Sequence, residues 1–83
     1  MIIDAAILKD STIYSGRRHF IIINNAEKGF FKENSVQGFI TDSGEFLDRE
    51  QALEYAYKCN QISKALYKER VKYSKELFSE DLW

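Results

Sequence analysis

The sequence lacks several residue types that would assign the chain to a familiar class of protein. Its 83 residues include no proline, one cysteine and one histidine. One cysteine excludes an intramolecular disulfide, and one cysteine with one histidine is too few ligands for a zinc cluster, so we expect no metal site. No apolar run approaches the roughly 20 residues needed to cross a bilayer, and no basic leader opens the chain. We therefore expect a protein of the reducing cytoplasm that does not use a membrane.

The length and the charge balance narrow the possible partners. Residues 1–83 are expected to form one small domain with a modest core, for which association into a homo-oligomer would add buried surface. The formal net charge of -1 argues against a protein that coats duplex nucleic acid through bulk electrostatics. An anionic partner should therefore be small.

The first half of the chain has the pattern of a β-hairpin followed by a helix. The apolar run 2–8 and the strand-forming run 12–14 flank a polar turn, which predicts the hairpin. Ser15 is a candidate N-cap, and apolar residues then recur at helical spacing as far as Gly29, a candidate C-terminal stop. The β-branched triplet 21–23 leaves an extended strand open as the alternative.

The second half repeats this order after a connecting loop at residues 30–35. Residues 36–41 and 45–47 flank an Asp-Ser-Gly turn, which predicts a second hairpin. Asp48 followed by Gln51 resembles a capping box and should open a helix. We therefore predict an α+β fold with ββαββα order and a C-terminal helical extension, basic over 64–75. Three large apolar residues at the end of the chain should dock on the core or on a neighbouring subunit: Phe78, Leu82 and Trp83.

The sequence offers little for catalysis. His19 is the only histidine, and it has no serine or cysteine at a spacing typical of a nucleophile and its base. Cys59 lies in a predicted amphipathic helix, where a buried and inert thiol is expected. The carboxylate pair Asp48 and Glu50 is explained by helix capping. We therefore expect no catalytic residue, no cofactor and no enzymatic activity.

The sequence offers more residues for ligand binding than for catalysis, because basic residues follow two of the predicted turns. Arg17 and Arg18 lie where the first helix should begin, and Arg49 opens the second helix. The positive end of the helix dipole disfavours cations, so the retained arginines suggest that an anion binds nearby through guanidinium groups and free N–H groups. Solvated surface arginines remain the alternative. Four aromatic residues could stack on a base, or else belong to the core: Tyr14, Phe30, Phe31 and Phe39.

Four segments carry a resemblance to a known family. Residues 14–19 read YSGRRH, residues 37–41 read QGFIT, residues 44–52 read GEFLDREQA, and the chain ends in LFSEDLW. These motifs resemble a family of small phage-encoded proteins, and the chain looks like the anti-Thoeris sponge proteins of phages. Such proteins sequester cyclic ADP-ribose signals, and in some members cyclic oligonucleotides, without cleaving them. Phe20 departs from the family pattern, and so does the short loop before the second hairpin.

The resemblance implies a phage protein that binds a small phosphate-bearing nucleotide in the cytoplasm of the host cell. The implied ligand-binding residues are Arg17, Arg18 and Arg49 for the phosphates, with Tyr14, His19 and Phe39 for the base or ribose. Two other functions stay open. One is an anti-CRISPR-like inhibitor that covers a host protein with the basic stretch 64–75 and exposed aromatics. The other is a cyclic-nucleotide phosphodiesterase that uses His19.

Overall fold

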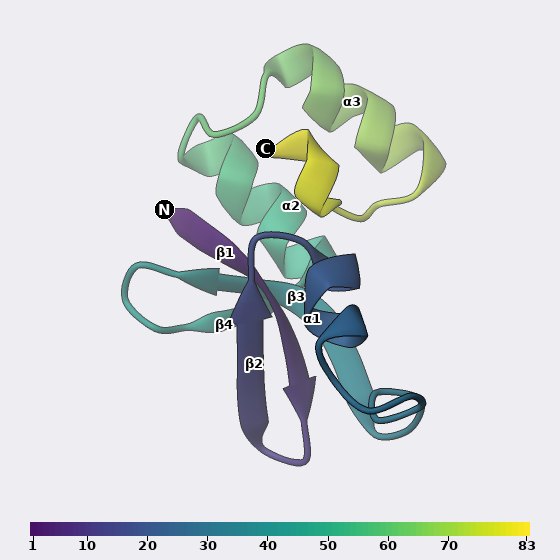
Figure 1. The fold of residues 1–83 in the computed structure, drawn as a ribbon. Helices are drawn as coiled ribbons and strands as arrows, with labels where there is room; N and C mark the ends of the chain where they lie inside the picture. Colours follow the sequence, from purple (N-terminus) through teal and green to yellow (C-terminus); the bar gives the residue numbers. More distant parts are fainter.

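The computed structural model describes residues 1–83 and confirms the predicted α+β architecture with ββαββα order (Figure 1). The α2 helix follows β4 directly, and α3 and a single 3-10 turn extend the fold at its C-terminal end. No helix combines the length and the apolarity needed to span a bilayer. The elements are β1 Ile2–Lys9, β2 Thr12–Gly16, α1 His19–Asn24, β3 Ser35–Thr41, β4 Phe46–Asp48, α2 Arg49–Lys58, α3 Lys64–Tyr73 and η1 Ser79–Asp81.

The four strands form one antiparallel sheet in the order β2-β1-β3-β4. The central strand β1 buries Ala5, Ala6 and Ile7 in succession. Because successive side chains in a strand point to opposite faces, both faces of the sheet are covered at this point. This explains why the first strand reads as a continuous apolar run and not as an alternating one.

The hydrophobic core lies where α1, α2 and the C-terminal segment meet the sheet. Phe39 on β3, Leu53 on α2 and Leu77 are all fully or almost fully buried. The α2 helix contributes the apolar face that its spacing predicted, including Ala52 and Ala56. Figure 1 shows that α3 lies farther from the β1–β2 turn than α2 does.

Two local predictions in the second half are confirmed. Gly44 has a φ of 84°, the left-handed conformation required in the turn between β3 and β4. The Asp48 side chain accepts a hydrogen bond from the backbone N–H of Gln51 at 2.8 Å, and the Gln51 side chain accepts one from the backbone of Asp48 at 3.0 Å. This reciprocal pair is the predicted capping box, so Asp48 starts α2.

The predicted extent of the first helix is wrong at both ends. Ser15 pairs with Ala6 inside the hairpin, so it belongs to β2, and Arg18 is the N-cap of a helix that ends at Asn24. The ladder with β1 therefore outweighs the capping preference of Ser15. Three β-branched isoleucines and the asparagines that follow support only a short helix. Gly29 has a φ of 80° but lies in a separate turn.

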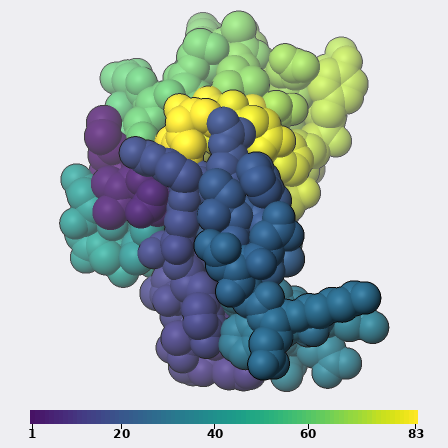
Figure 2. Space-filling view, in the orientation of Figure 1, coloured from purple at the N-terminus to yellow at the C-terminus, as the bar shows by residue number.

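The C-terminal segment packs against the body of the protein, as its apolar residues predicted. Phe78, Leu82 and Trp83 are all half-buried, and the last two pack on the core. Figure 2 shows the C-terminal residues, in yellow, lying against the dark blue segment that follows β2. The prediction for Cys59 is wrong, because this residue is the C-cap of α2 and its thiol is exposed.

Candidate functional site

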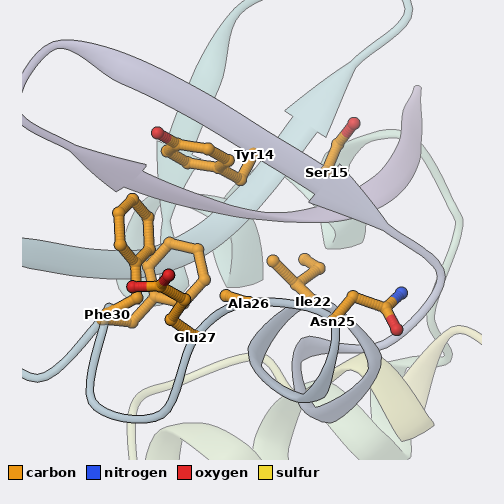
Figure 3. A pocket seen from close by; sticks show the side chains of 8 residues that line it. Tyr14, Ser15, Ile22, Asn25, Ala26, Glu27 and Phe30 are labelled. Atoms are coloured by element: carbon orange, nitrogen blue, oxygen red, sulfur yellow. The ribbon is translucent and has the colours of Figure 1, made fainter.

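An open groove of about 440 Å³ lies between β2, α1 and the loop that follows α1. Pockets that bind small molecules have volumes of this order. Figure 3 shows Tyr14 and Phe30 at one end of the groove with Glu27, and Ser15 and Asn25 toward the other end. The groove is lined by Tyr14, Ser15, Ile22, Asn25, Ala26, Glu27, Phe30 and Phe31.

Three aromatic rings form one wall of this groove. The ring centroids of Tyr14 and Phe30 are 5.5 Å apart, those of Tyr14 and Phe31 are 5.2 Å apart, and those of the two phenylalanines are 4.9 Å apart. All three pairs meet edge to face, with interplanar angles of 79° to 83°. Such contacts bring the electropositive edge of one ring to the electronegative face of the next. Tyr14 and Phe31 are half-buried and Phe30 is 37% exposed, so part of the aromatic surface remains open to a ligand.

The charge of the groove is negative. Glu27 is the only charged residue in its lining, and Ser15 and Asn25 add neutral polar groups. No arginine or lysine lines it. A phosphate placed in the groove would therefore face a carboxylate and no cation.

Two of the residues that sequence analysis grouped for ligand binding instead bind each other. His19 is 6% exposed, and its Nε2 donates to the Gly38 carbonyl at 2.7 Å. That bond leaves Nδ1 as the acceptor, and Nη2 of Arg49 lies 3.4 Å from it. Burial, and secondarily the charge of Arg49, lower the pKa of His19, while the bond to Gly38 opposes the shift. The histidine is therefore neutral at pH 7 and holds two segments together.

Two further hydrogen bonds of Arg49 are also made within the fold. Its Nη1 donates to the Leu77 carbonyl at 2.9 Å and its Nη2 donates to Oε1 of Gln37 at 2.5 Å. The guanidinium lies over the Phe78 ring, 5.1 Å from the centroid. A second hollow of about 410 Å³ adjoins this arginine, but three carboxylates line it: Asp48, Glu50 and Glu76. The start of α2 is thus an acidic surface around a cation that is already bonded.

Arg17 is bound to the C-terminal residue and to β1. Its guanidinium lies over the Trp83 ring at 4.6 Å, donates to the Ile3 carbonyl at 2.9 Å and approaches Asp4 at 3.7 Å. The indole N–H of Trp83 in turn donates to the Arg17 carbonyl. Arg18 differs, because it pairs with no carboxylate.

The six predicted ligand-binding residues therefore do not converge on one cavity. Tyr14 lines the aromatic groove, whereas Phe39 is fully buried and its ring packs edge to face on His19 at 5.2 Å. Sequence reasoning named Phe30 and Phe31 as aromatic platforms but missed Glu27, because no motif marks a glutamate in a loop as part of a groove. No group of three histidine, cysteine or acidic side chains is arranged to hold a metal ion.

Comparison with known proteins places the chain in a phage context. A family model described as "Phage T4 y16D protein" matches residues 1–83, the whole chain. No curated protein and no solved structure matches it.

Proposed function

Because the chain belongs to the phage T4 y16D protein family, we propose that it acts in infection by covering a surface of a host protein and performs no chemistry on its target. The observation that carries this proposal is the exposed apolar face of α1. Phe20 is 61% exposed, Ile21 38% and Ile23 40%. These three large side chains lie within one short helix whose other face packs on the sheet.

Exposure on this scale needs a physical explanation in so small a chain. Single exposed apolar residues are ordinary, but several on one short helix next to an aromatic groove are typical of a surface that a partner covers. Removing Phe20 and its neighbours from water would contribute about 25 cal/mol per Å² of apolar area buried. The groove adjoins α1, because Ile22 on the buried side of the helix and residues 25 and 26 just after its end are part of the lining.

The surroundings of His19 support an absence of catalysis. Both ring nitrogens are bonded within the fold, and the ring is buried. A general base must reach the proton that it removes, and this imidazole has no free nitrogen directed to solvent. A phosphodiesterase that uses His19 is therefore not the function that we propose.

A second candidate function is sequestration of a cyclic nucleotide or a cyclic ADP-ribose type of messenger in the host cell. The volume of the groove and the rings of Tyr14, Phe30 and Phe31 favour it, since bases stack on such surfaces. Phosphate recognition would fall to Arg18, because Arg17 and Arg49 are bonded within the chain. A homo-oligomer that brings a second copy of Arg18 to the groove would be needed for tight binding.

The host-protein proposal is tested with a matched pair of surface variants. The wild-type protein, Phe20→Ser and a Tyr73→Ser control are used to capture proteins from a lysate of host cells. Tyr73 is 73% exposed on α3, so the control removes an aromatic side chain of comparable exposure from another helix. We expect one captured host protein whose binding, repeated with purified components, is weakened at least about tenfold by Phe20→Ser alone.

Sedimentation at several concentrations separates this proposal from self-association. A dimer that dissociates in Phe20→Ser, with no host protein captured, would show that the α1 face binds a second copy and would overturn the proposal. Thermal unfolding with a panel of cyclic nucleotides and ADP-ribose isomers tests the second candidate. A bound ligand at one hundred times its dissociation constant should stabilise the protein by about 2.7 kcal/mol. Chromatography of that ligand distinguishes sequestration, with full recovery, from cleavage.

A further inference from the structure

The aromatic groove has a charge that predicts the chemistry of its occupant. Resting on the proposed function, we propose that the groove receives an arginine side chain of the partner protein. Three ring surfaces and one carboxylate, that of Glu27, face the same hollow, and no basic residue lines it. Aromatic faces and a carboxylate both attract a cation and both disfavour an anion.

The chain already shows that this cluster accommodates a cation. The ammonium of Lys9 lies 5.3 Å from the centroid of Phe30. Lys9 is held there by the Glu33 carbonyl at 2.9 Å and by Asp10 at 3.5 Å, and it is not part of the groove lining. One face of the cluster is thus occupied by a cation of the chain itself, while the surface that faces the groove remains open.

A guanidinium fits the groove better than an ammonium does. It is planar and weakly hydrated, so it stacks on rings at a low desolvation cost, and its five donors need acceptors. The Glu27 carboxylate and the Asn25 side-chain carbonyl provide acceptors in the lining. The apolar stem of an arginine would pack on Ile22 and Ala26, between the two polar ends.

The experiment uses three probes that share a phenyl ring and differ in charge. Phenylguanidinium is a cation, phenylurea is its neutral isostere and phenyl phosphate is an anion. Each is titrated into the full-length protein while backbone amide shifts are followed by NMR. We expect saturable shifts at residues 14–15 and 25–31, with phenylguanidinium at least about threefold tighter than phenylurea and phenyl phosphate weakest.

A matched pair of variants assigns the preference to one carboxylate. Glu27→Gln should reduce the preference for phenylguanidinium over phenylurea to the part that the rings provide, whereas Glu33→Gln, in the same loop but outside the lining, should leave the preference unchanged. Unchanged amide shifts elsewhere confirm that both variants are folded. Equal binding of phenylguanidinium and phenylurea to the wild type would overturn the inference, and so would preferred binding of phenyl phosphate or the absence of saturable shifts.

The outcomes also separate this inference from the proposed function. If Phe20→Ser releases a host protein while the groove shows no preference for the cation, the function stands and the arginine assignment fails. If the cation preference holds and no host protein binds, the groove chemistry stands and the proposed function fails.

Discussion

The guanidinium of Arg49 and the imidazole of His19 form a contact of 3.4 Å that joins the start of α2 to the start of α1. The same guanidinium reaches the carbonyl of Leu77, so the C-terminal segment meets both helices at this point. The contact uses polar side chains to hold three distant segments together, and it leaves Arg49 few donors for a phosphate. The two residues are therefore better understood as part of the fold than as a ligand site.

The first prediction concerns the effect of low pH on the free energy of unfolding. Burial, and after it the charge of Arg49, lower the pKa of His19 below its usual value of 6.5. The unfolded chain therefore binds a proton more readily than the folded chain, and protonation favours unfolding. The contribution of neutral His19 to the free energy of unfolding should be fully present above about pH 6.5. It should be lost as the pH drops below that value. Urea unfolding at intervals between pH 7.5 and 5 measures this slope.

His19→Gln supplies the control, because an amide can still donate to the Gly38 carbonyl but does not titrate. This variant should lose the slope between pH 6.5 and 5 that the wild type shows. A wild-type protein that becomes more stable as the pH falls through this range would contradict the neutral assignment of His19.

The second prediction concerns Arg49 itself. Arg49→Met keeps much of the apolar stem but leaves the Leu77 carbonyl and the Gln37 side chain without a donor. We expect a loss of about 2 to 4 kcal/mol in the free energy of unfolding, since hydrogen bonds from charged groups contribute about 1.5 to 3 kcal/mol each. Arg18→Met is the matched control and should change the free energy of unfolding by less than about 0.5 kcal/mol. Equal effects of the two substitutions would contradict a structural role for Arg49.

The third prediction concerns the C-terminal segment. Leu77 is fully buried, so Leu77→Ala should cost about 2 to 5 kcal/mol. The only tryptophan is Trp83, whose indole N–H donates to the Arg17 carbonyl, so its fluorescence reports the docking of the segment. As urea is added, tryptophan emission should shift to longer wavelength at a lower urea concentration in Leu77→Ala than in the wild type. If the C-terminal segment undocks before the rest of the chain unfolds, the fluorescence change should occur at a lower urea concentration than the loss of helical circular dichroism.

Local signals in the sequence were sufficient for most of the fold. The turn at Gly44 and the capping box of Asp48 and Gln51 are determined by residues within a few positions of each other. Ser15 shows where this reasoning fails. Its capping preference is local, but its pairing with Ala6 depends on where β1 lies in the folded chain. The extent of the hairpin therefore required the tertiary structure.

The candidate site was harder to predict from the sequence than the fold, because it also depends on contacts between residues that are distant in the chain. The residue that covers the guanidinium of Arg17 is Trp83, 66 positions later in the chain. No pattern near Arg17 indicates that its donors are used within the fold. Conversely, the groove depends on how the loop after α1 folds back on Tyr14, which spacing along the chain does not reveal. The aromatic residue types were predicted, but their shared carboxylate was not.

The fourth prediction concerns Gly38, the residue opposite Ala6 in the sheet. A Cβ at this position would run into the backbone carbonyl of Leu47 and would lie 2.7 Å from the Phe46 ring. The carbonyl of Gly38 also accepts the hydrogen bond from His19 at 2.7 Å, so displacement of this strand would break that contact. Gly38→Ala should therefore destabilise the fold by more than about 3 kcal/mol, because backbone atoms of two paired strands must separate.

Gly29→Ala is the control for Gly38→Ala, since Gly29 has a φ of 80° with no atom within 4 Å of an added Cβ. It should cost only the strain of the left-handed conformation, about 1 to 2 kcal/mol. Thermal unfolding of both variants by circular dichroism measures the difference. If Gly38→Ala melts at the same temperature as Gly29→Ala, or above it, β3 and β4 do not approach each other as closely at this position as the structure describes. In that case the Gly38 carbonyl would not be a fixed acceptor for His19. The predicted fall in the free energy of unfolding below about pH 6.5 would then not be expected.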